Sequence, residues 1–109
     1  MDEEKNLLCN DYEKCIRASE FFSALSNPNR MAIVCFLITG KKSVSEIVNK
    51  LKLPQSSVSL HLSKLADKRL ITKERLGKNV YYKIKNSDIK KILLIVSDKF
   101  INKLQIERR

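Results

Sequence analysis

The stretch SVSEIVNKLKLPQSSVSLHLSKL, residues 43–65, decides the fold, because its pattern is that of two short helices joined by a tight turn. Ser43 and Glu46 have the spacing of a capping box, which marks the start of the first helix. Pro54 interrupts the pattern, since proline cannot continue a helix and disfavours the helical conformation of the residue before it. A second helix is then expected over residues 55–68.

The two faces of this second helix differ in chemistry. One face carries apolar residues at positions i, i+4 and i+7, which predicts that it is buried. The other face carries Gln55, Ser56, Ser59, Leu60, Ser63 and Lys64. Short hydrogen-bonding groups with few charges suit a helix in a DNA major groove, where glutamine pairs with adenine and serine with several base edges. The alternative is a solvated polar face that is rich in serine.

Length and composition limit the classes of protein to which the chain can belong. Its 109 residues suffice for one domain with a modest core, and 43% apolar residues with two glycines and two prolines favour a helix-rich fold. No secretory or membrane segment is expected, because the longest apolar run, residues 31–38, is too short to span a bilayer. Three cysteines without tight spacing do not indicate a disulfide framework, which favours a cytoplasmic location.

The net charge of +10 is unevenly distributed. Residues 1–20 hold six acidic and three basic residues, whereas residues 21–109 hold six acidic and 19 basic residues. A strongly positive domain attracts polyanions, so double-stranded DNA is the expected partner. The alternative is a lysine-rich composition without functional meaning. A membrane-surface role is not expected, since no segment combines a basic face with aromatic anchors.

The residues before the opening stretch predict two further helices. The first is expected from about residue 10 to residue 25, where apolar side chains recur at helical spacing. Asn27 can cap the second helix and Pro28 can take its first position. This helix is apolar nearly all round to about Thr39, which places it at the centre of the core, and Gly40 supplies its end.

The residues after the opening stretch predict a basic hairpin. Two strands are expected, over residues 70–76 and 80–85, and Gly77-Lys78-Asn79 between them fits a hairpin loop. The basic residues of this hairpin are Lys73, Arg75, Lys78, Lys83 and Lys85. A cationic hairpin beside a helix-turn-helix is typical of a winged helix, whose wing contacts phosphates.

A last helix is expected from Asp88 to about Ile106, capped by Ser87. Its apolar positions cover more than the single stripe that packing on its own domain requires, so part of this surface should meet a second subunit. The first helix has a similar surplus. We therefore expect a homodimer through the first and last helices, with two recognition helices about 34–36 Å apart.

The predicted fold class is mainly α with a small β-hairpin, a winged helix-turn-helix in the order α-α-α-α-β-β-α. Residues 1–10 are expected to form a flexible acidic tail, and residues 11–109 a single domain with terminal dimerisation helices.

Specific motifs are distributed along most of the chain: ALSNPNR at residues 24–30, SVSEI at 43–47, QSSVSLHLSKL at 55–65 and VYY at 80–82. Taken together, they resemble the ArsR/SmtB family of bacterial winged-helix repressors over about residues 21–100. Within that family the chain is most similar to NolR-like members, which lack a metal site, and to members of the BigR, SqrR and HlyU type. The resemblance implies a homodimeric, sequence-specific transcriptional regulator that blocks a promoter by occupying it.

The resemblance also implies roles for individual residues. Gln55, Ser56, Ser59 and Leu60 would face the bases. Ser57, Ser63, Lys64, Arg75, Lys78 and Asn79 would hold phosphates. Leu60 stands where the family often has a histidine, and contact with a thymine methyl group is the natural substitute. Pro54 stands where a serine cap is usual.

The metal switches that are common in this family are not expected here. One family site needs a cysteine pair where Ser43 and Ser45 stand, and serine hydroxyls are poor ligands for soft metals. The other needs histidines in the last helix, whereas the single histidine of the chain is His61, on the predicted recognition helix. No cofactor is expected, and nothing in the sequence provides the groups that an enzyme requires.

Cys35 is similar to a cysteine of the family members that sense persulfides and oxidants, which use a second cysteine in the last helix. This chain has no cysteine there, and Cys15 is the candidate substitute. The alternative is that Cys35 packs as a small apolar residue. A thiol-switched repressor is therefore one alternative function. The others are a winged-helix module that binds an acidic protein partner and a protein that binds DNA without sequence preference.

Overall fold

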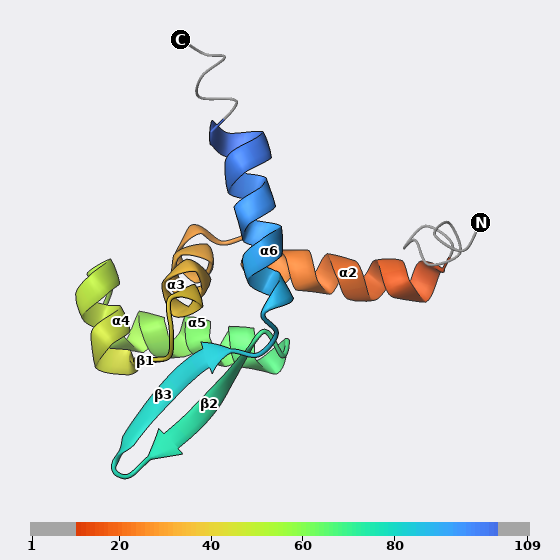
Figure 1. The fold of residues 1–109 in the computed structure, drawn as a ribbon. Coiled ribbons are helices and arrows are strands. Elements are labelled where there is room, and N and C mark those ends of the chain that lie inside the picture. The colour runs from red at the N-terminus through yellow and green to blue at the C-terminus, as the bar shows by residue number, and fades with distance from the viewer. Residues whose placement is uncertain (1–10, 103–109) are drawn as a thin grey trace.

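The computed structural model describes residues 11–102 and has the predicted mainly α architecture with a winged hairpin (Figure 1). The elements in chain order are α2 Tyr12–Leu25, α3 Pro28–Ile38, β1 Lys42–Ser43, α4 Val44–Leu51, α5 Gln55–Asp67, β2 Ile71–Leu76, β3 Asn79–Ile84, α6 Asp88–Ile95 and the π-helical segment η2 Val96–Asn102. The flexible tail expected over residues 1–10 lies outside the described residues, as do residues 103–106 of the predicted last helix.

Helix α3 lies at the centre of the core, as its sequence predicts. Ile33 and Val34 are fully buried and Leu37 is nearly so, and each such side chain stabilises the fold by roughly 1.5–3 kcal/mol. Helices α4 and α5 and strand β3 pack around α3. No single helix among the described residues is long and apolar enough to cross a membrane. Among these residues, only α2 and α3 taken together reach that length and apolar character, and they are bent by 89°.

The start of α3 has the predicted cap. The Asn27 side-chain oxygen accepts hydrogen bonds from the backbone amides of Asn29 and Arg30, at 2.9 and 3.1 Å, and Pro28 takes the first helical position. The Asn27 side chain satisfies two amides that the first turn of a helix leaves without a partner, and Pro28 has no amide hydrogen that would need one. The chain therefore bends between α2 and α3 at a position that its sequence specifies.

The sheet has three antiparallel strands in the order β1-β3-β2, whereas the sequence predicted two. Strand β1 pairs Lys42 with Tyr82 and Ser43 with Tyr81. A strand of two residues shows no periodicity, so the pattern that revealed β2 and β3 could not reveal β1.

The predicted three-residue hairpin loop is also wrong. Asn79 pairs with Leu76 and belongs to β3, which leaves only Gly77 and Lys78 in the turn. Gly77 has φ of +64°, a conformation that favours glycine. Asn79 therefore lies at the start of a strand and is held in register with β2.

The start and the length of the last helix differ from the prediction. Ser87 makes no side-chain cap; instead, the Asn86 side-chain oxygen accepts a hydrogen bond from the Asp88 amide at 2.8 Å. An asparagine side chain readily bonds the amide two residues on, which leaves the serine without this role. From Val96 to Asn102 the backbone continues as a π-helix, so the expected continuous α-helix is interrupted at Val96.

Candidate nucleic-acid interface

Helix α4 and the turn after it orient the helix that carries the candidate interface. The predicted capping box is confirmed: the Glu46 amide donates to Ser43 Oγ at 3.1 Å, and the Ser43 amide donates to Glu46 Oε1 at 3.0 Å. Helix α4 ends at Leu51, and the φ of 57° at the next residue, Lys52, is left-handed. The Lys52 amide donates to the Val48 carbonyl at 2.8 Å. This costly conformation for a lysine turns the chain sharply toward α5.

Helix α5 is anchored by its inner face. Val58, Leu62 and Leu65 are fully buried, which confirms the predicted apolar face. The helix begins at Gln55, directly after Pro54, and no side chain caps it. The amides of its first turn therefore have no side-chain acceptor, and helix N-termini of this kind attract phosphate groups.

The outer face of α5 carries the residues that the sequence singled out. Gln55, Ser56, Ser59, Leu60, Ser63 and Lys64 are exposed, and Ser57 is half-buried. No acidic residue occurs from Gln55 to Ala66. Leu60 is an apolar side chain that is 55% exposed in the middle of this polar surface. The face therefore offers hydrogen-bonding groups, one apolar contact and no repulsion toward an anionic partner.

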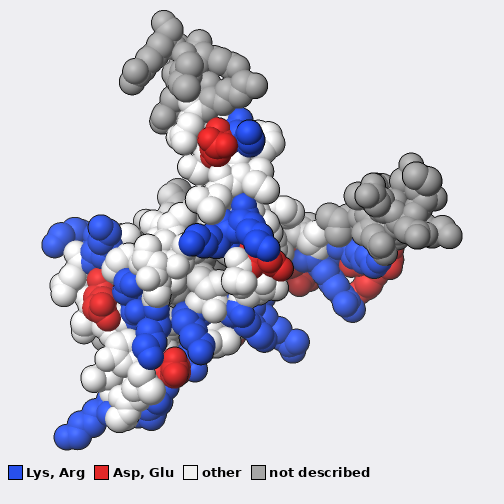
Figure 2. Space-filling model, in the orientation of Figure 1, with Lys and Arg blue, Asp and Glu red and all other residues white. Residues whose placement is uncertain are grey.

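The wing, defined as β2, the Gly77-Lys78 turn and β3, provides a second basic surface. Arg75, Lys78 and Asn79 are exposed at its end. Figure 2 shows basic side chains at the tip of the wing and along its base, with few acidic ones among them. The predicted interface residues are thus divided between the outer face of α5 and the tip of the wing.

An acidic residue that sequence reasoning did not single out neutralises part of the charge at the base of the wing. Glu74 Oε2 lies 3.9 Å from the Lys41 ammonium and 3.7 Å from that of Lys83. Within residues 11–102, by contrast, Lys64, Arg75 and Lys78 form no ion pair. Lys64 on α5, with Arg75 and Lys78 at the tip of the wing, therefore keeps its positive charge for an external anion.

His61 lies on α5 but is half-buried and close to positive groups. Burial, together with the charges of Arg30 and Lys64, lowers the pKa of its imidazole. No described group hydrogen-bonds its Nδ1 atom. Arg30 is fixed nearby, since its Nε donates to the Ala24 carbonyl at 2.7 Å. The imidazole of His61 therefore takes up a proton less readily than an ordinary histidine does.

The described cysteines, Cys15 and Cys35, lie on different helices. Within residues 11–102, no group of three histidine, cysteine, aspartate or glutamate side chains is placed to hold a metal ion. Cys35 is exposed on α3, and both the sensing role and the alternative of an apolar packing role stay predictions. Partial burial nevertheless raises the pKa of its thiol, which lowers the fraction present as the nucleophilic thiolate. Cys15 is half-buried on α2.

Comparison with known proteins identifies the family. Residues 27–73 match the model of the bacterial regulatory protein, arsR family. The transcriptional repressor PagR of Bacillus anthracis is 35% identical over 80 residues, which cover 72% of this chain and 80% of PagR. The chain belongs to the ArsR family. The alignments with the first curated ArsR-family relatives span between 57% and 66% of those proteins' own lengths.

Solved structures agree with this assignment. The crystal structure of NolR from Sinorhizobium fredii is 34% identical, covers 82% of this chain and 89% of NolR, and superposes with a TM-score of 0.75. A homodimeric winged helix-turn-helix DNA-binding domain from Mycobacterium bovis superposes with a TM-score of 0.74, covering 87% of this chain and 86% of that domain. Since it is only 22% identical, it shows the shared fold alone.

Proposed function

We propose that this ArsR-family chain is a sequence-specific, DNA-binding transcriptional repressor that acts in the cytoplasm as a homodimer. The observation that carries the proposal is the exposed outer face of α5, which combines hydrogen-bonding groups with the absence of acidic residues. Helix α5 would lie in the major groove, whose width admits an α-helix. Occupation of a promoter by the dimer would then block transcription.

The proposed contacts divide into base reading and phosphate binding. Gln55 would pair with a base edge, as would Ser56 and Ser59, while Leu60 would contact a thymine methyl group. The residues proposed to hold phosphates are Ser57, Ser63, Lys64, Arg75, Lys78 and Asn79. Within residues 11–102, Lys64, Arg75 and Lys78 form no ion pair, unlike Lys41 and Lys83. This supports their assignment to phosphate, because a cation without a carboxylate partner can bind phosphate without first breaking an ion pair.

The proposed dimer would form through α2, α6 and η2. These elements project away from the core as two arms (Figure 1). Their large exposed apolar side chains are Tyr12, Ile16 and Phe22 on α2, and Ile92, Leu94, Ile95, Val96, Phe100 and Ile101 on α6 and η2. An apolar surface of this extent is typical of a subunit interface. The M. bovis domain, which shares the fold, is described as homodimeric.

The experiment that tests the proposal measures fluorescence anisotropy of a labelled duplex taken from the DNA upstream of the gene. Unlabelled duplex of the same sequence should compete at least about 10³-fold better than random duplex, the lower end of the range for specific regulators. Equal competition by both duplexes would indicate binding without sequence preference. No binding to either would favour the module that recognises an acidic protein partner.

A thiol-switched repressor is the second candidate, and the exposure of Cys35 supports it. The same anisotropy measurement, repeated after polysulfide treatment, tests this candidate. Loss of binding that reductant restores, and that a Cys35→Ser variant does not show, would establish the switch. Binding that is indifferent to treatment would agree with the raised thiol pKa and would leave a repressor without a thiol switch.

A further inference from the structure

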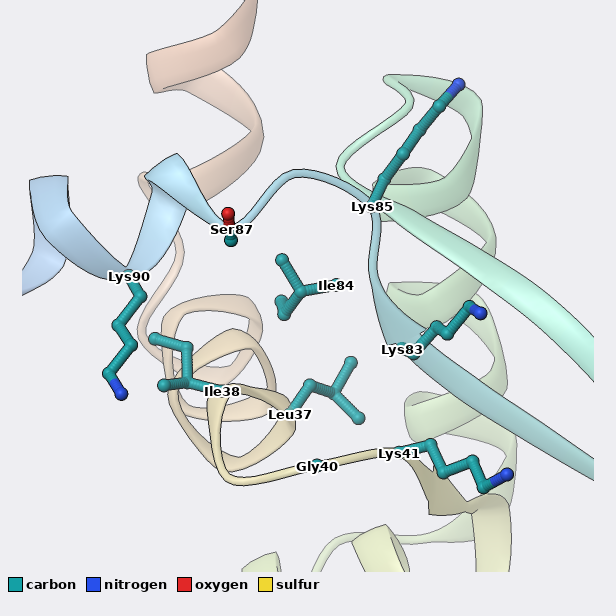
Figure 3. A pocket seen from close by; sticks show the side chains of 9 residues that line it. All are labelled: Leu37, Ile38, Gly40, Lys41, Lys83, Ile84, Lys85, Ser87 and Lys90. Carbon is teal, nitrogen blue, oxygen red and sulfur yellow. The ribbon is translucent and has the colours of Figure 1, made fainter.

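A pocket that takes no part in the proposed DNA contacts lies between the end of α3, the end of β3 and the start of α6 (Figure 3). Its volume is about 400 Å³, within the range of small-molecule sites. Its apolar lining consists of Leu37, Ile38 and Ile84, and no residue of α5 takes part. The sequence gives no sign of this pocket, because three separate segments form it.

Basic residues surround the apolar lining without any acidic residue among them. The four lysines that line the pocket are Lys41, Lys83, Lys85 and Lys90. In Figure 3, Lys90 extends from α6 beside Ile38, whereas the side chains of Lys41, Lys83 and Lys85 point away from the apolar residues. Lys90 is therefore the cation beside the apolar surface, and the other three lysines line its edge.

The charges of these lysines are only partly compensated. Lys41 and Lys83 share the single carboxylate of Glu74, at 3.9 and 3.7 Å. Lys90 forms no ion pair with any residue from 11 to 102, whereas its neighbour Lys91 pairs with Asp88 at 3.3 Å. A pocket that combines an apolar lining with surplus positive charge is complementary to a molecule with an apolar body and an anionic group.

We propose that this pocket binds a small organic carboxylate with an apolar body, of the size of a medium-chain acid. The body would cover Leu37, Ile38 and Ile84, and the carboxylate would pair with Lys90. Both parts are needed, because an ion pair at an exposed lysine contributes little by itself. A neutral molecule of the same shape would lose the charge complementarity that distinguishes this pocket.

Such a ligand would regulate DNA binding, and this step rests on the proposed repressor function. Its body bridges β3, which belongs to the wing, and α6, which belongs to the proposed dimer surface. Occupancy of the pocket would therefore shift the wing relative to the dimer and change the affinity for DNA.

The first experiment uses the full chain without DNA, so that its result does not depend on the proposed function. Decanoate, below its micelle concentration, is titrated into ¹⁵N-labelled protein, with decanol, decyltrimethylammonium and acetate as matched probes. We expect saturable shifts of the Gly40, Ile84 and Ser87 amides with decanoate, and at least about fivefold weaker binding of the other three. Equal binding of decanol or of the cation, or shifts spread over the whole chain, would overturn the proposal.

Matched variants then separate a site from general attraction. The Lys83→Gln/Lys90→Gln variant removes two lysines of the pocket, whereas Lys91→Gln/Lys99→Gln removes two exposed lysines outside it. The first variant should bind decanoate about fivefold more weakly and the second within about twofold of the unchanged chain. An equal loss in both variants would show attraction to net charge and overturn the site.

The regulatory step is tested last, by anisotropy on the upstream duplex with and without decanoate. A change in DNA affinity that occurs in the unchanged chain and in Lys91→Gln/Lys99→Gln, but is reduced in Lys83→Gln/Lys90→Gln, supports regulation through the pocket. Saturable decanoate binding without any change in DNA affinity overturns the regulatory step alone. Failure of the chain to bind DNA counts against the proposed function and leaves the binding result in place.

Discussion

The two ends of the described molecule expose opposite kinds of side chain. The outer face of α5 and the wing tip present serine, glutamine, lysine and arginine, with Leu60 and Leu76 as the large exposed apolar residues. The arms formed by α2 and by α6 with η2 present a series of large apolar side chains. Water solvates the first surface well and the second poorly, so the two surfaces call for different partners.

This difference assigns one partner to each end. A polar surface with unpaired cations gains most from a phosphate backbone and from base edges. An apolar surface gains most from burial against another apolar surface, and a second copy of the same chain supplies one by symmetry. Substitutions that alter one end, while the other end and the core stay intact, therefore test this assignment.

The largest effect is expected from a charge in the apolar arm. Leu94→Asp/Phe100→Asp places two carboxylates where the side chains are 57% and 59% exposed, so the core should remain folded. The dimer should dissociate, because an interface tolerates buried unpaired charges poorly. With one recognition helix per molecule, affinity for the upstream duplex should fall by on the order of 10²-fold or more.

Sedimentation velocity measures the subunit state of this variant, and anisotropy measures its affinity for DNA. Lys91→Gln/Lys99→Gln changes two exposed residues of the same arm and serves as the control. A Leu94→Asp/Phe100→Asp variant that sediments as the unchanged chain does would move the subunit interface away from this arm.

The second effect concerns base reading. Gln55→Ala should weaken binding to the preferred duplex by ~1–3 kcal/mol and relax specificity at one base pair, since the bidentate contact of the amide is lost. Affinities for duplexes that are substituted at each position measure this effect. The matched control is Asn49→Ala, an exposed amide on α4. An equal loss on every sequence would remove Gln55 from base recognition.

The sequence predicted the polar end in more detail than the apolar end because of local chemistry. The capping box of Ser43 and Glu46, the break at Pro54 and the inner face of α5 depend on residues a few positions apart, and the structure confirms them. The cap of α3 at Asn27 is local in the same way. Such signals act within one turn of the chain and are visible in a single sequence.

The features that the sequence did not predict depend on competition between neighbouring capping residues or on contacts between distant segments of the chain. Ser87 and Asn86 can both cap α6, and the sequence could not show that asparagine does so. Strand β1 exists because residues 42–43 meet β3, about 40 positions later in the chain. The Glu74 ion pairs join three segments, and the pocket between α3, β3 and α6 also joins three. None of these has a periodic pattern that a single sequence displays.

The third effect tests the scaffold of the polar end. Ser43→Ala removes the acceptor of the Glu46 amide and should cost about 1 kcal/mol of unfolding free energy. Urea unfolding followed by circular dichroism measures this cost, with Ser45→Ala, an exposed serine on the same helix, as the control. Equal losses in the two variants would mean that the capping box adds nothing beyond ordinary helix propensity.

The smallest effect is expected at the tip of the wing. Lys78 is exposed in the Gly77-Lys78 turn and takes part in no ion pair described within residues 11–102. Lys78→Ala should weaken binding on all DNA sequences alike and reduce the slope of log affinity against log salt concentration by about 0.9 per lost phosphate contact. Anisotropy titrations at several salt concentrations measure the slope.

Lys99→Ala is the control for Lys78→Ala, because it removes the same charge from the apolar arm. If the two variants lower the slope equally, the positive charge of the whole chain attracts DNA and the wing tip makes no specific phosphate contact. If only Lys78→Ala lowers it, the phosphate contact lies at the polar end. The position of the lost charge then determines the salt dependence of DNA binding more than its amount does. A molecule divided into a DNA-binding end and a dimerisation end requires this result.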